Sequence, residues 1–304
     1  MTTRSFRESR REDGLSGAVA QLAGSSYGPG AQVMVPNVVR FIGAVLGFSL
    51  IGSGALMAGI DVGGLVFAVS PLIAAVIVRV VGGDGLRGVG LNWTGRQGWY
   101  WLAIVMFPAA MSVSVGLGLL VDAVELGKDV SFASVGTAML AGLVPRIVLA
   151  VGEEFGWRGY LTPLLHANRV PPLANHAIVG LTWTIWHVPF ILASPTFTNQ
   201  PLWLFAPLFT LGVMAMAIIL GETRLRTRSV WPAVYAHAIG SALCYTLLGE
   251  GVFARFDSLW YSPRPEGIVM IIVTGVIAIL VFRVPRPATP LPASDQLPPF
   301  LSIP

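Results

Sequence analysis

The chain has 304 residues, of which 54% are hydrophobic and only 11% are charged. A protein with so few charged residues could not cover its surface with polar groups in water, so the composition predicts a membrane protein. The net charge of +4 comes from basic residues that stand singly or in twos and threes beside apolar runs. This distribution excludes the basic tracts of a nucleic-acid-binding protein. The single cysteine, Cys244, excludes an intramolecular disulfide and a cysteine metal cluster.

Apolar runs of about 20 residues, the length that crosses a bilayer as one helix, recur along the chain. They lie at residues 38–59, 64–82, 99–121, 133–151, 173–192, 201–221, 229–248 and 266–283. The predicted fold is therefore an all-α, polytopic membrane helix bundle of about eight transmembrane helices. The fourth helix is expected to continue from about residue 133 to 165 and to bend at Pro145, because the residues that follow the run are still largely apolar.

The two ends of the chain differ from this membrane domain, which we place at residues 36–284. Residues 1–35 are rich in Arg, Ser and Gly, and residues 285–304 are rich in Pro. Such compositions predict disordered tails. With eight spans, fifteen basic residues fall on the side of the N-terminus and three on the other side. This bias predicts that both termini are cytoplasmic and that the protein is a multi-pass protein of the cell membrane.

The remaining basic residue, Arg146, falls inside the fourth predicted span. An arginine at this depth is costly unless it faces the protein interior and finds a partner. Arg146 is expected either to pair with a buried carboxylate or to show that the span boundary is misplaced, and the second interpretation is slightly favoured.

Two adjacent glutamates follow that span. Arg158 lies four residues after Glu154, so the two side chains should pair on one helix face. Glu153 points elsewhere and is left without this partner. Gly152, Gly156 and Gly159 form a stripe close to the face of Glu153. Such a stripe lets another backbone approach, which is either a neighbouring helix or a substrate peptide.

Two histidines lie inside predicted spans, His187 in the fifth and His237 in the seventh. A glutamate and histidines inside a membrane suit the binding and activation of a water molecule. His187 lies deeper in its span than His237, so the two converge only if the helices tilt or the fifth helix begins later. Of the other two histidines, His166 is expected to be solvated, and His176 is expected to lie at the level of the lipid headgroups.

The order of these motifs on successive spans resembles that of the CAAX protease and bacteriocin-processing enzymes, also called the CPBP or Abi family. The resemblance covers roughly residues 143–248. Its three motifs are Glu153-Glu154-Phe-Gly-Trp-Arg158, Trp183-Thr-Ile-Trp-His187 and His237-Ala-Ile-Gly-Ser241.

The resemblance implies an intramembrane endopeptidase. Glu153 and His187 would bind and activate a water for attack on a peptide carbonyl, with Glu153 as general base. His237, together with Ser241, would stabilise the oxyanion that develops.

The resemblance also implies supporting roles and shows two departures. Glu154 and Arg158 would hold the helix and the site in shape. Trp183 stands where the family usually has phenylalanine, and it lies on the helix face of His187, whose imidazole it could orient. Ser241 stands where the family usually has asparagine, and serine donates fewer hydrogen bonds than the amide.

The residues fit both a zinc site and a site that activates water without a metal. Glu153, His187 and His237 could supply the two histidines and one carboxylate that zinc often takes in catalytic sites. The chain has no H-E-x-x-H motif, however, and the family is described both as metalloproteases and as metal-independent glutamate proteases. Direct activation of water is slightly preferred over zinc.

The leading hypothesis is an endopeptidase whose site opens toward the cytoplasm and whose substrate is a membrane-associated peptide or protein in the lipid bilayer. Arginine outnumbers lysine eighteen to one, which indicates a GC-rich bacterial genome in which prenylated substrates are not expected. The bacterial relatives are linked to bacteriocin processing and self-immunity. The alternatives are a non-catalytic membrane immunity or partner-binding protein on the same scaffold, and a transporter, for which inverted repeats would be expected.

Overall fold

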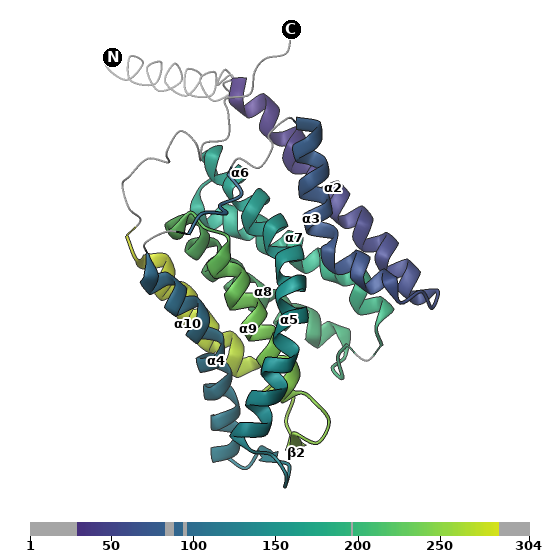
Figure 1. The fold of residues 1–304 in the computed structure, drawn as a ribbon, viewed down its shortest axis with the longest axis vertical. Coiled ribbons are helices and arrows are strands. Elements are labelled where there is room, and N and C mark those ends of the chain that lie inside the picture. The colour runs from purple at the N-terminus through teal and green to yellow at the C-terminus, as the bar shows by residue number, and fades with distance from the viewer. Residues whose placement is uncertain (1–28, 83–87, 94–95, 196, 286–304) are drawn as a thin grey trace, which may run out of the picture.

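The structure is a computed structural model that describes residues 29–82, 88–93, 96–195 and 197–285. It consists almost entirely of helices, as the apolar runs predict (Figure 1). In chain order the helices are α2 (Pro29–Met57), α3 (Val62–Gly82), α4 (Gln97–Leu120), α5 (Phe132–Gly156), the π-helical turn η1 (Trp157–Leu161), α6 (Thr162–Ala167), α7 (Pro172–Ala193), α8 (Leu202–Thr227), α9 (Trp231–Leu247) and α10 (Ile268–Arg283). Two short strands, β1 (Val124–Leu126) and β2 (Phe253–Phe256), pair antiparallel at the end of the molecule away from the start of α2 (Figure 1).

Each of the eight predicted apolar segments falls on a helix. Six helices among the described residues are long and apolar enough to cross a membrane. They are Pro36–Met57, Val62–Gly82, Gln97–Leu120, Phe132–Ala167, Pro172–Ala193 and Leu202–Thr227. The apolar α10 is shorter, and α9 has 17 residues. The chain is thus a multi-pass membrane protein, while the total of eight spans and the cytoplasmic position of both termini stay predictions.

The predicted tails lie outside the described residues, except for residues 29–35 at the start of α2 and residue 285. Their disorder stays a prediction.

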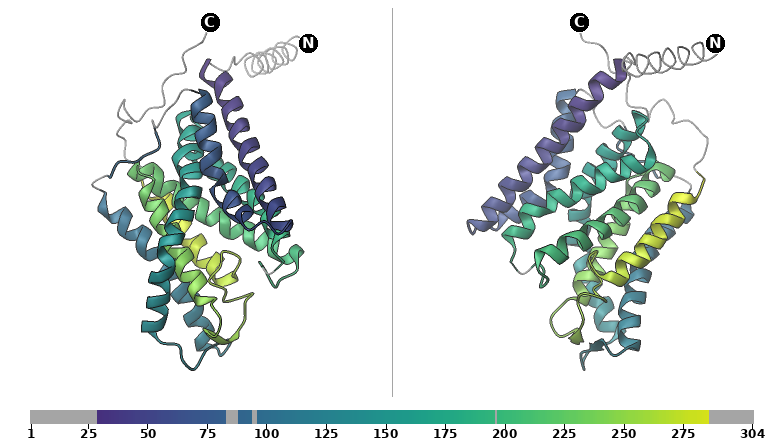
Figure 2. Two further views of the ribbon diagram at one scale, coloured as in Figure 1. Left: turned by 45° about the vertical axis from the view of Figure 1, so that its right-hand side comes forward. Right: turned by 180° about the vertical axis from the view of Figure 1, so that it is seen from behind.

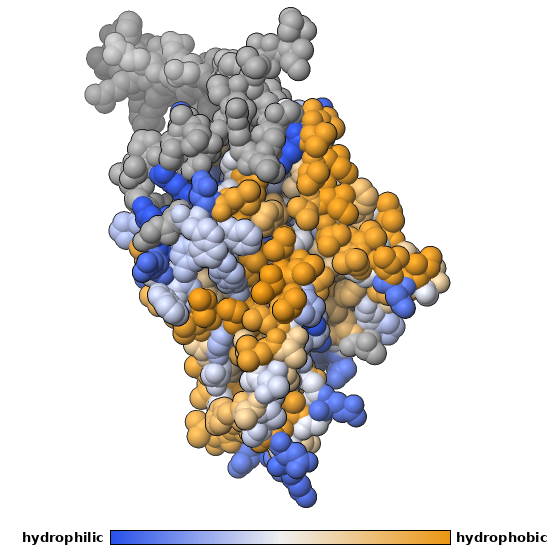
Figure 3. Space-filling view, in the orientation of Figure 1, coloured by the Kyte–Doolittle hydropathy of each residue, from blue (hydrophilic) through white to orange (hydrophobic). Residues whose placement is uncertain are grey.

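The surface of the helices is apolar over most of the molecule. Figure 3 shows apolar side chains over α2 and α3 and across the middle of the molecule, and polar side chains around the β1–β2 end. On α2, Leu50 and Ile51 are 62% and 63% exposed, and on α3, Val80 is 75% exposed. Side chains of this kind are stable at the surface only when lipid covers them.

Helix α3 packs closely against α5 at the predicted glycine stripe. A Cβ at Gly156 would lie 2.6 Å from the carbonyl carbon and oxygen of Pro71, and a Cβ at Gly152 would lie 3.2 Å from Val69. A neighbouring helix, rather than a substrate, therefore occupies this part of the stripe. Close approach of α3 fixes the end of α5 that carries the two glutamates.

The fourth predicted helix does continue, as a 36-residue segment from Phe132 to Ala167. Its irregular turn is η1, directly after the two glutamates, whereas Pro145 lies within α5. Arginines from two other helices bind carbonyl groups of this turn. Arg79 donates to the carbonyl of Gly159 and Arg224 donates to that of Arg158, both at 2.9 Å. Backbone groups at membrane depth need such partners, so α3 and α8 hold η1 in place.

Candidate active site

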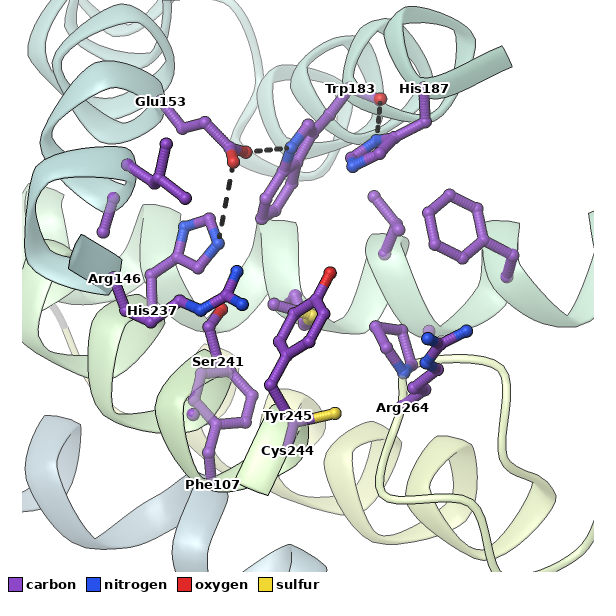
Figure 4. Close-up of a pocket in the computed structure, with 18 of the residues that line it drawn as sticks. Phe107, Arg146, Glu153, Trp183, His187, His237, Ser241, Cys244, Tyr245 and Arg264 are labelled. Carbon is purple, nitrogen blue, oxygen red and sulfur yellow. Dashed lines mark hydrogen bonds and ion pairs between the residues drawn. The ribbon is translucent and has the colours of Figure 1, made fainter. Parts of the chain in front are cut away.

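Glu153 lies in the last turn of α5 and faces a cavity inside the helix bundle (Figure 4). Its Oε2 accepts a hydrogen bond at 3.0 Å from the indole Nε1–H of Trp183 on α7. Its Oε1 lies 3.9 Å from Nε2 of His237 on α9. The side chains of Glu153 and His237 are only 13% and 12% exposed. Three helices therefore bring a carboxylate, an indole N–H and an imidazole together at the wall of the cavity.

Glu154 is fully buried behind this group and links two other residues. As expected, it pairs with Arg158, whose NH1 lies 3.0 Å from both carboxylate oxygens. Its Oε1 also lies 2.8 Å from Nδ1 of His237. Because a carboxylate paired with arginine only accepts hydrogen bonds, Nδ1 of His237 carries the proton and the opposite nitrogen, Nε2, is turned toward Glu153. Glu154 thus orients His237, a role that the sequence did not reveal.

Arg158 also contacts the ring that binds Glu153. Its guanidinium lies 4.5 Å from the centre of a Trp183 ring, and its side chain is fully buried. This cation–π contact joins the Glu154 pair to Trp183. The pair on η1 and the indole on α7 are therefore parts of one packed unit.

His187 is oriented by the backbone of its own helix. Its Nδ1 lies 2.8 Å from the carbonyl oxygen of Trp183, which can only accept, so Nδ1 donates and Nε2 is left for a ligand. The rings of Trp186 and Phe209 pack against it at centroid distances of 4.5 and 5.1 Å. The Trp183 ring lies between the two histidines, 6.3 Å from His187 and 5.7 Å from His237 (Figure 4).

The helices bring both histidines to the cavity although α7 begins at Pro172, almost where the sequence predicts it. A later start of the fifth helix is therefore not the reason for their convergence. Figure 2 shows helices that are inclined to one another rather than parallel, which allows residues at different positions along their helices to meet.

Ser241 lies one helical turn after His237 on α9 and lines the same cavity. Among the residues that the structure describes, its hydroxyl makes no hydrogen bond. The hydroxyl is therefore free to bind a group that enters the cavity.

The cavity has a volume of about 470 Å³ and is lined mainly by apolar side chains of α3, α4, α5, α7, α8, α9 and α10. Glu153, His187 and His237 line it, together with Phe197 and the loop residues 263–266. The expected opening of the site toward the cytoplasm stays a prediction.

The possible zinc ligands do not form a metal site in this arrangement. Across the described ranges, no three side chains of His, Cys, Asp or Glu lie close enough to share a metal ion. Glu153 and His237 are near each other, but the Trp183 ring separates His187 from His237. The donor set of Glu153, His187 and His237 does not fit a three-ligand zinc centre, and we derive no step through a metal.

Arg146 does not pair with a buried carboxylate, since it makes no ion pair with a carboxylate of the described residues. It lies well inside a helical segment that continues to Ala167, beyond the predicted end of the fourth span, as the second interpretation allows. Its guanidinium lies 3.6 Å from the centre of the Tyr245 ring and lines the cavity. The side chain therefore faces the interior of the protein rather than lipid.

A second buried polar cluster escaped the sequence analysis. His176 is fully buried inside the protein, and its Nε2 lies 2.7 Å from Oε1 of Glu222 on α8. Its expected position at the level of the lipid headgroups stays a prediction. The other oxygen of Glu222 pairs with Arg226 at 2.6 Å. The spacing of Glu222 and Arg226, four residues apart near the end of an apolar run, was a signal that could have indicated this pair.

The fold and the site define a polytopic membrane protein with a glutamate and two histidines at one internal cavity. Residues 135–243 match the family model described as type II CAAX prenyl endopeptidase Rce1-like. This part of the chain, which runs from α5 into α9, is therefore an Rce1-like domain of the CAAX protease family, as the motifs indicated. It contains all seven residues singled out for the site. A comparison with curated proteins gave no match.

Proposed function

We propose that the protein is an intramembrane endopeptidase that hydrolyses a peptide bond of a membrane-associated peptide or protein. The observation that carries this proposal is the position of Glu153, held by Trp183 and facing His237 at the wall of an apolar cavity. A carboxylate at membrane depth needs a functional or structural reason, and this one has no arginine or lysine partner within ion-pair distance among the described residues. The Rce1-like domain supports the same reaction class.

In the proposed reaction, a water molecule enters between Glu153 and the histidines. Glu153 takes a proton from the water, and the water oxygen forms a bond with the carbonyl carbon of the substrate. Nε2 of His187 accepts a hydrogen bond from the water and holds it in line. The C–N bond then breaks, and the proton passes from Glu153 to the leaving nitrogen, which yields a carboxylic acid and an amine. Transfer of the acid's proton to the amine gives the carboxylate and the ammonium group.

The carbonyl oxygen becomes negatively charged during the attack and needs hydrogen-bond donors. The Nδ1–H of His237 is bound to Glu154. When the ring carries a second proton, on Nε2, this N–H can donate to the carbonyl oxygen. The hydroxyl of Ser241 supplies a second donor from the next turn of α9. Glu154 and Arg158 act by holding His237 and the end of α5.

We place the enzyme in a bacterial cell membrane, where the arginine-rich composition fits a GC-rich genome. Its substrate would be a peptide or protein segment at the membrane, as in bacteriocin processing or self-immunity. The alternative is a non-catalytic immunity or partner-binding protein, which Ser241 in the usual place of asparagine favours.

Cleavage by the purified, vesicle-reconstituted protein tests the proposal. The wild type and the variants Glu153→Gln and His187→Ala are incubated with a library of membrane-proximal peptides, and cleavage products are identified by mass spectrometry. Loss of the general base is expected to lower the rate by about 10²–10⁴-fold. A matched control is Glu125→Gln, because Glu125 on β1 is 60% exposed and lies outside the cavity.

Cleavage by Glu153→Gln at the wild-type rate would contradict the proposal. Peptides that bind to the wild type without being cleaved would instead support the partner-binding alternative. Metal analysis and the effect of chelators in the same assay decide whether a metal takes part.

A further inference from the structure

A proline turn in α3 contacts both of the helices that carry Glu153 and His187, although α3 lies outside the matched residues. Pro71 has no backbone N–H, so the carbonyl of Phe67, four residues earlier, lacks its helical hydrogen bond. The hydroxyl of Ser70 donates to this carbonyl at 2.7 Å instead. The hydroxyl oxygen of Ser70 is therefore left to accept a hydrogen bond from another helix.

The donor to Ser70 is the indole of Trp186 on α7. Nε1–H of Trp186 donates to the hydroxyl oxygen at 2.7 Å, and both side chains are fully buried. An indole N–H can only donate, and the proton of the serine is bound to the carbonyl of Phe67, so the direction of both hydrogen bonds is fixed. The ring of Phe67 also stacks on the Trp186 ring at a centroid distance of 4.0 Å. One turn of α3 thus holds the indole by its N–H and by its face.

Trp186 directly precedes His187, and its ring is one wall of the space that the imidazole occupies. The two rings meet at 74° with centroids 4.5 Å apart, and the Phe67 ring lies 6.0 Å from His187. Among the described residues, the imidazole makes one hydrogen bond, from Nδ1 to the carbonyl of Trp183 in its own helix. That bond does not fix the imidazole relative to α5, so its place depends on the contacts between helices.

The same turn of α3 also holds the end of α5. A Cβ at Gly156 would lie 2.6 Å from the carbonyl carbon and oxygen of Pro71, and Glu153 lies three residues before Gly156. Ser70, the neighbour of Pro71, binds the residue before His187. Consecutive residues of α3 therefore contact the helix of the carboxylate and the helix of the imidazole, and their separation depends on this turn.

Helix α2 packs behind the turn. A Cβ at Gly52 would lie 2.6 Å from the backbone nitrogen of Phe67, so the two helices are in backbone contact there. The buried hydroxyl of Ser49 on α2 donates to the carbonyl of Trp186 at 2.7 Å. Because close-packed helices move together, α2 limits any shift of the turn relative to α7.

We propose that the turn Phe67–Pro71 of α3 is a positioning element of the active site, which holds the imidazole of His187 at a set distance from the carboxylate of Glu153. The inference rests on the proposed function, in which both groups contact one water molecule. A displacement of about 1 Å between reacting groups can lower a rate by about 10²-fold. Ser70 and Trp186 are thus positioning residues, which act through His187 and do not line the cavity.

Ring-nitrogen NMR of the full-length, vesicle-reconstituted protein tests the placement of His187 without any cleavage. The chain has four histidines, so labelling with ¹⁵N-histidine gives few signals, and those of His187 are identified by their absence from His187→Ala. The wild type is expected to show His187 as one neutral tautomer with the proton on Nδ1. In Ser70→Ala and in Trp186→Phe, these signals are expected to broaden or split, because the imidazole then adopts more than one orientation.

Steady-state cleavage of a peptide that the wild type cuts tests whether this placement serves the reaction. Ser70→Ala and Trp186→Phe are each expected to lower kcat about 10- to 100-fold and to leave KM within about twofold, because neither side chain lines the cavity. The double variant should lose no more than the more impaired single variant, because both substitutions break the same hydrogen bond. Trp186→Phe leaves Ser70 bound to Phe67, so it provides the test if Ser70→Ala does not fold.

The matched control is Ser114→Ala on α4. It removes an equally buried hydroxyl, which has no hydrogen-bond partner in the described part of the chain. Both kcat and the ring signals of His187 should stay at their wild-type values in this variant.

A kcat within about twofold of the wild type in both Ser70→Ala and Trp186→Phe would overturn the positioning role. Unchanged His187 signals beside a lowered kcat would overturn it too, because the loss would then not act through His187. So would losses that multiply in the double variant, as two independent packing defects would produce. A wild type that cleaves no peptide would instead refute the proposed function, and the ring signals would still decide whether the turn holds His187.

Discussion

Replacing Trp183 by phenylalanine tests how Glu153 is held. The substitution installs the residue that related enzymes usually have, but it removes the indole N–H that donates to Oε2 of Glu153 at 3.0 Å. A hydrogen bond to a charged group contributes about 1.5–3 kcal/mol. Since each 1.36 kcal/mol is a factor of about ten in rate, the expected fall in kcat is about 10- to 150-fold. KM should change less, because the N–H is used by Glu153 and not by the substrate.

The assay is steady-state cleavage of a peptide that the wild type cuts, with thermal unfolding in detergent to verify the fold. The control is Trp157→Phe, which removes the same atoms from a fully buried ring 6.4 Å from Trp183. The indole N–H of Trp157 has no hydrogen-bond partner in the described part of the chain, so only packing is lost. A kcat for Trp183→Phe within about twofold of the wild type, or an equal loss in Trp157→Phe, would refute this reasoning.

Two further predictions concern packing and the oxyanion site. Gly156→Ala should lower the free energy of unfolding by about 1–3 kcal/mol, because the new Cβ would lie 2.6 Å from the backbone of Pro71. Thermal unfolding in detergent measures this, and Gly142→Ala in the same helix, with nothing within 4 Å of its Cβ, should be neutral; equal losses would argue against the close approach of α3. Ser241→Asn should raise kcat severalfold without a change in peptide affinity, because the amide brings a stronger donor to the cavity. A lower kcat in that variant would show that the serine hydroxyl is the better fit.

The sequence predicted the helical segments well because each is a long apolar run, and such a run has one stable form in lipid. It also predicted the pair of Glu154 and Arg158, since residues four apart on a helix are neighbours whatever surrounds them. For the same reason it indicated that Glu153 points away from Arg158.

The sequence did not predict the contacts between side chains of different helices. The hydrogen bond from Trp183 to Glu153 joins residues 30 positions apart, and the contact between His237 and Glu154 joins residues 83 positions apart. Each depends on the tilt and rotation of two helices, which packing sets and local pattern does not encode. The sequence therefore did not show that the indole of Trp183, which stands where phenylalanine is usual, donates to the carboxylate of Glu153.

Arg146 illustrates the same limit. Its position in a span is visible in the sequence, but whether it meets a carboxylate, lipid or a cavity depends on which face of α5 the neighbouring helices leave open. The π-helical turn after the glutamates was likewise invisible, because the arginines that bind its carbonyls come from α3 and α8.

The sequence by itself determined that this protein is an α-helical membrane protein and which glutamate and histidines are the candidates for catalysis, because hydropathy and helical spacing act over a few residues. Only the tertiary structure decided which donors hold those side chains and where the cavity extends. The close approach of helices distant in the chain fixes both, and that approach depends on the shapes of all their side chains together.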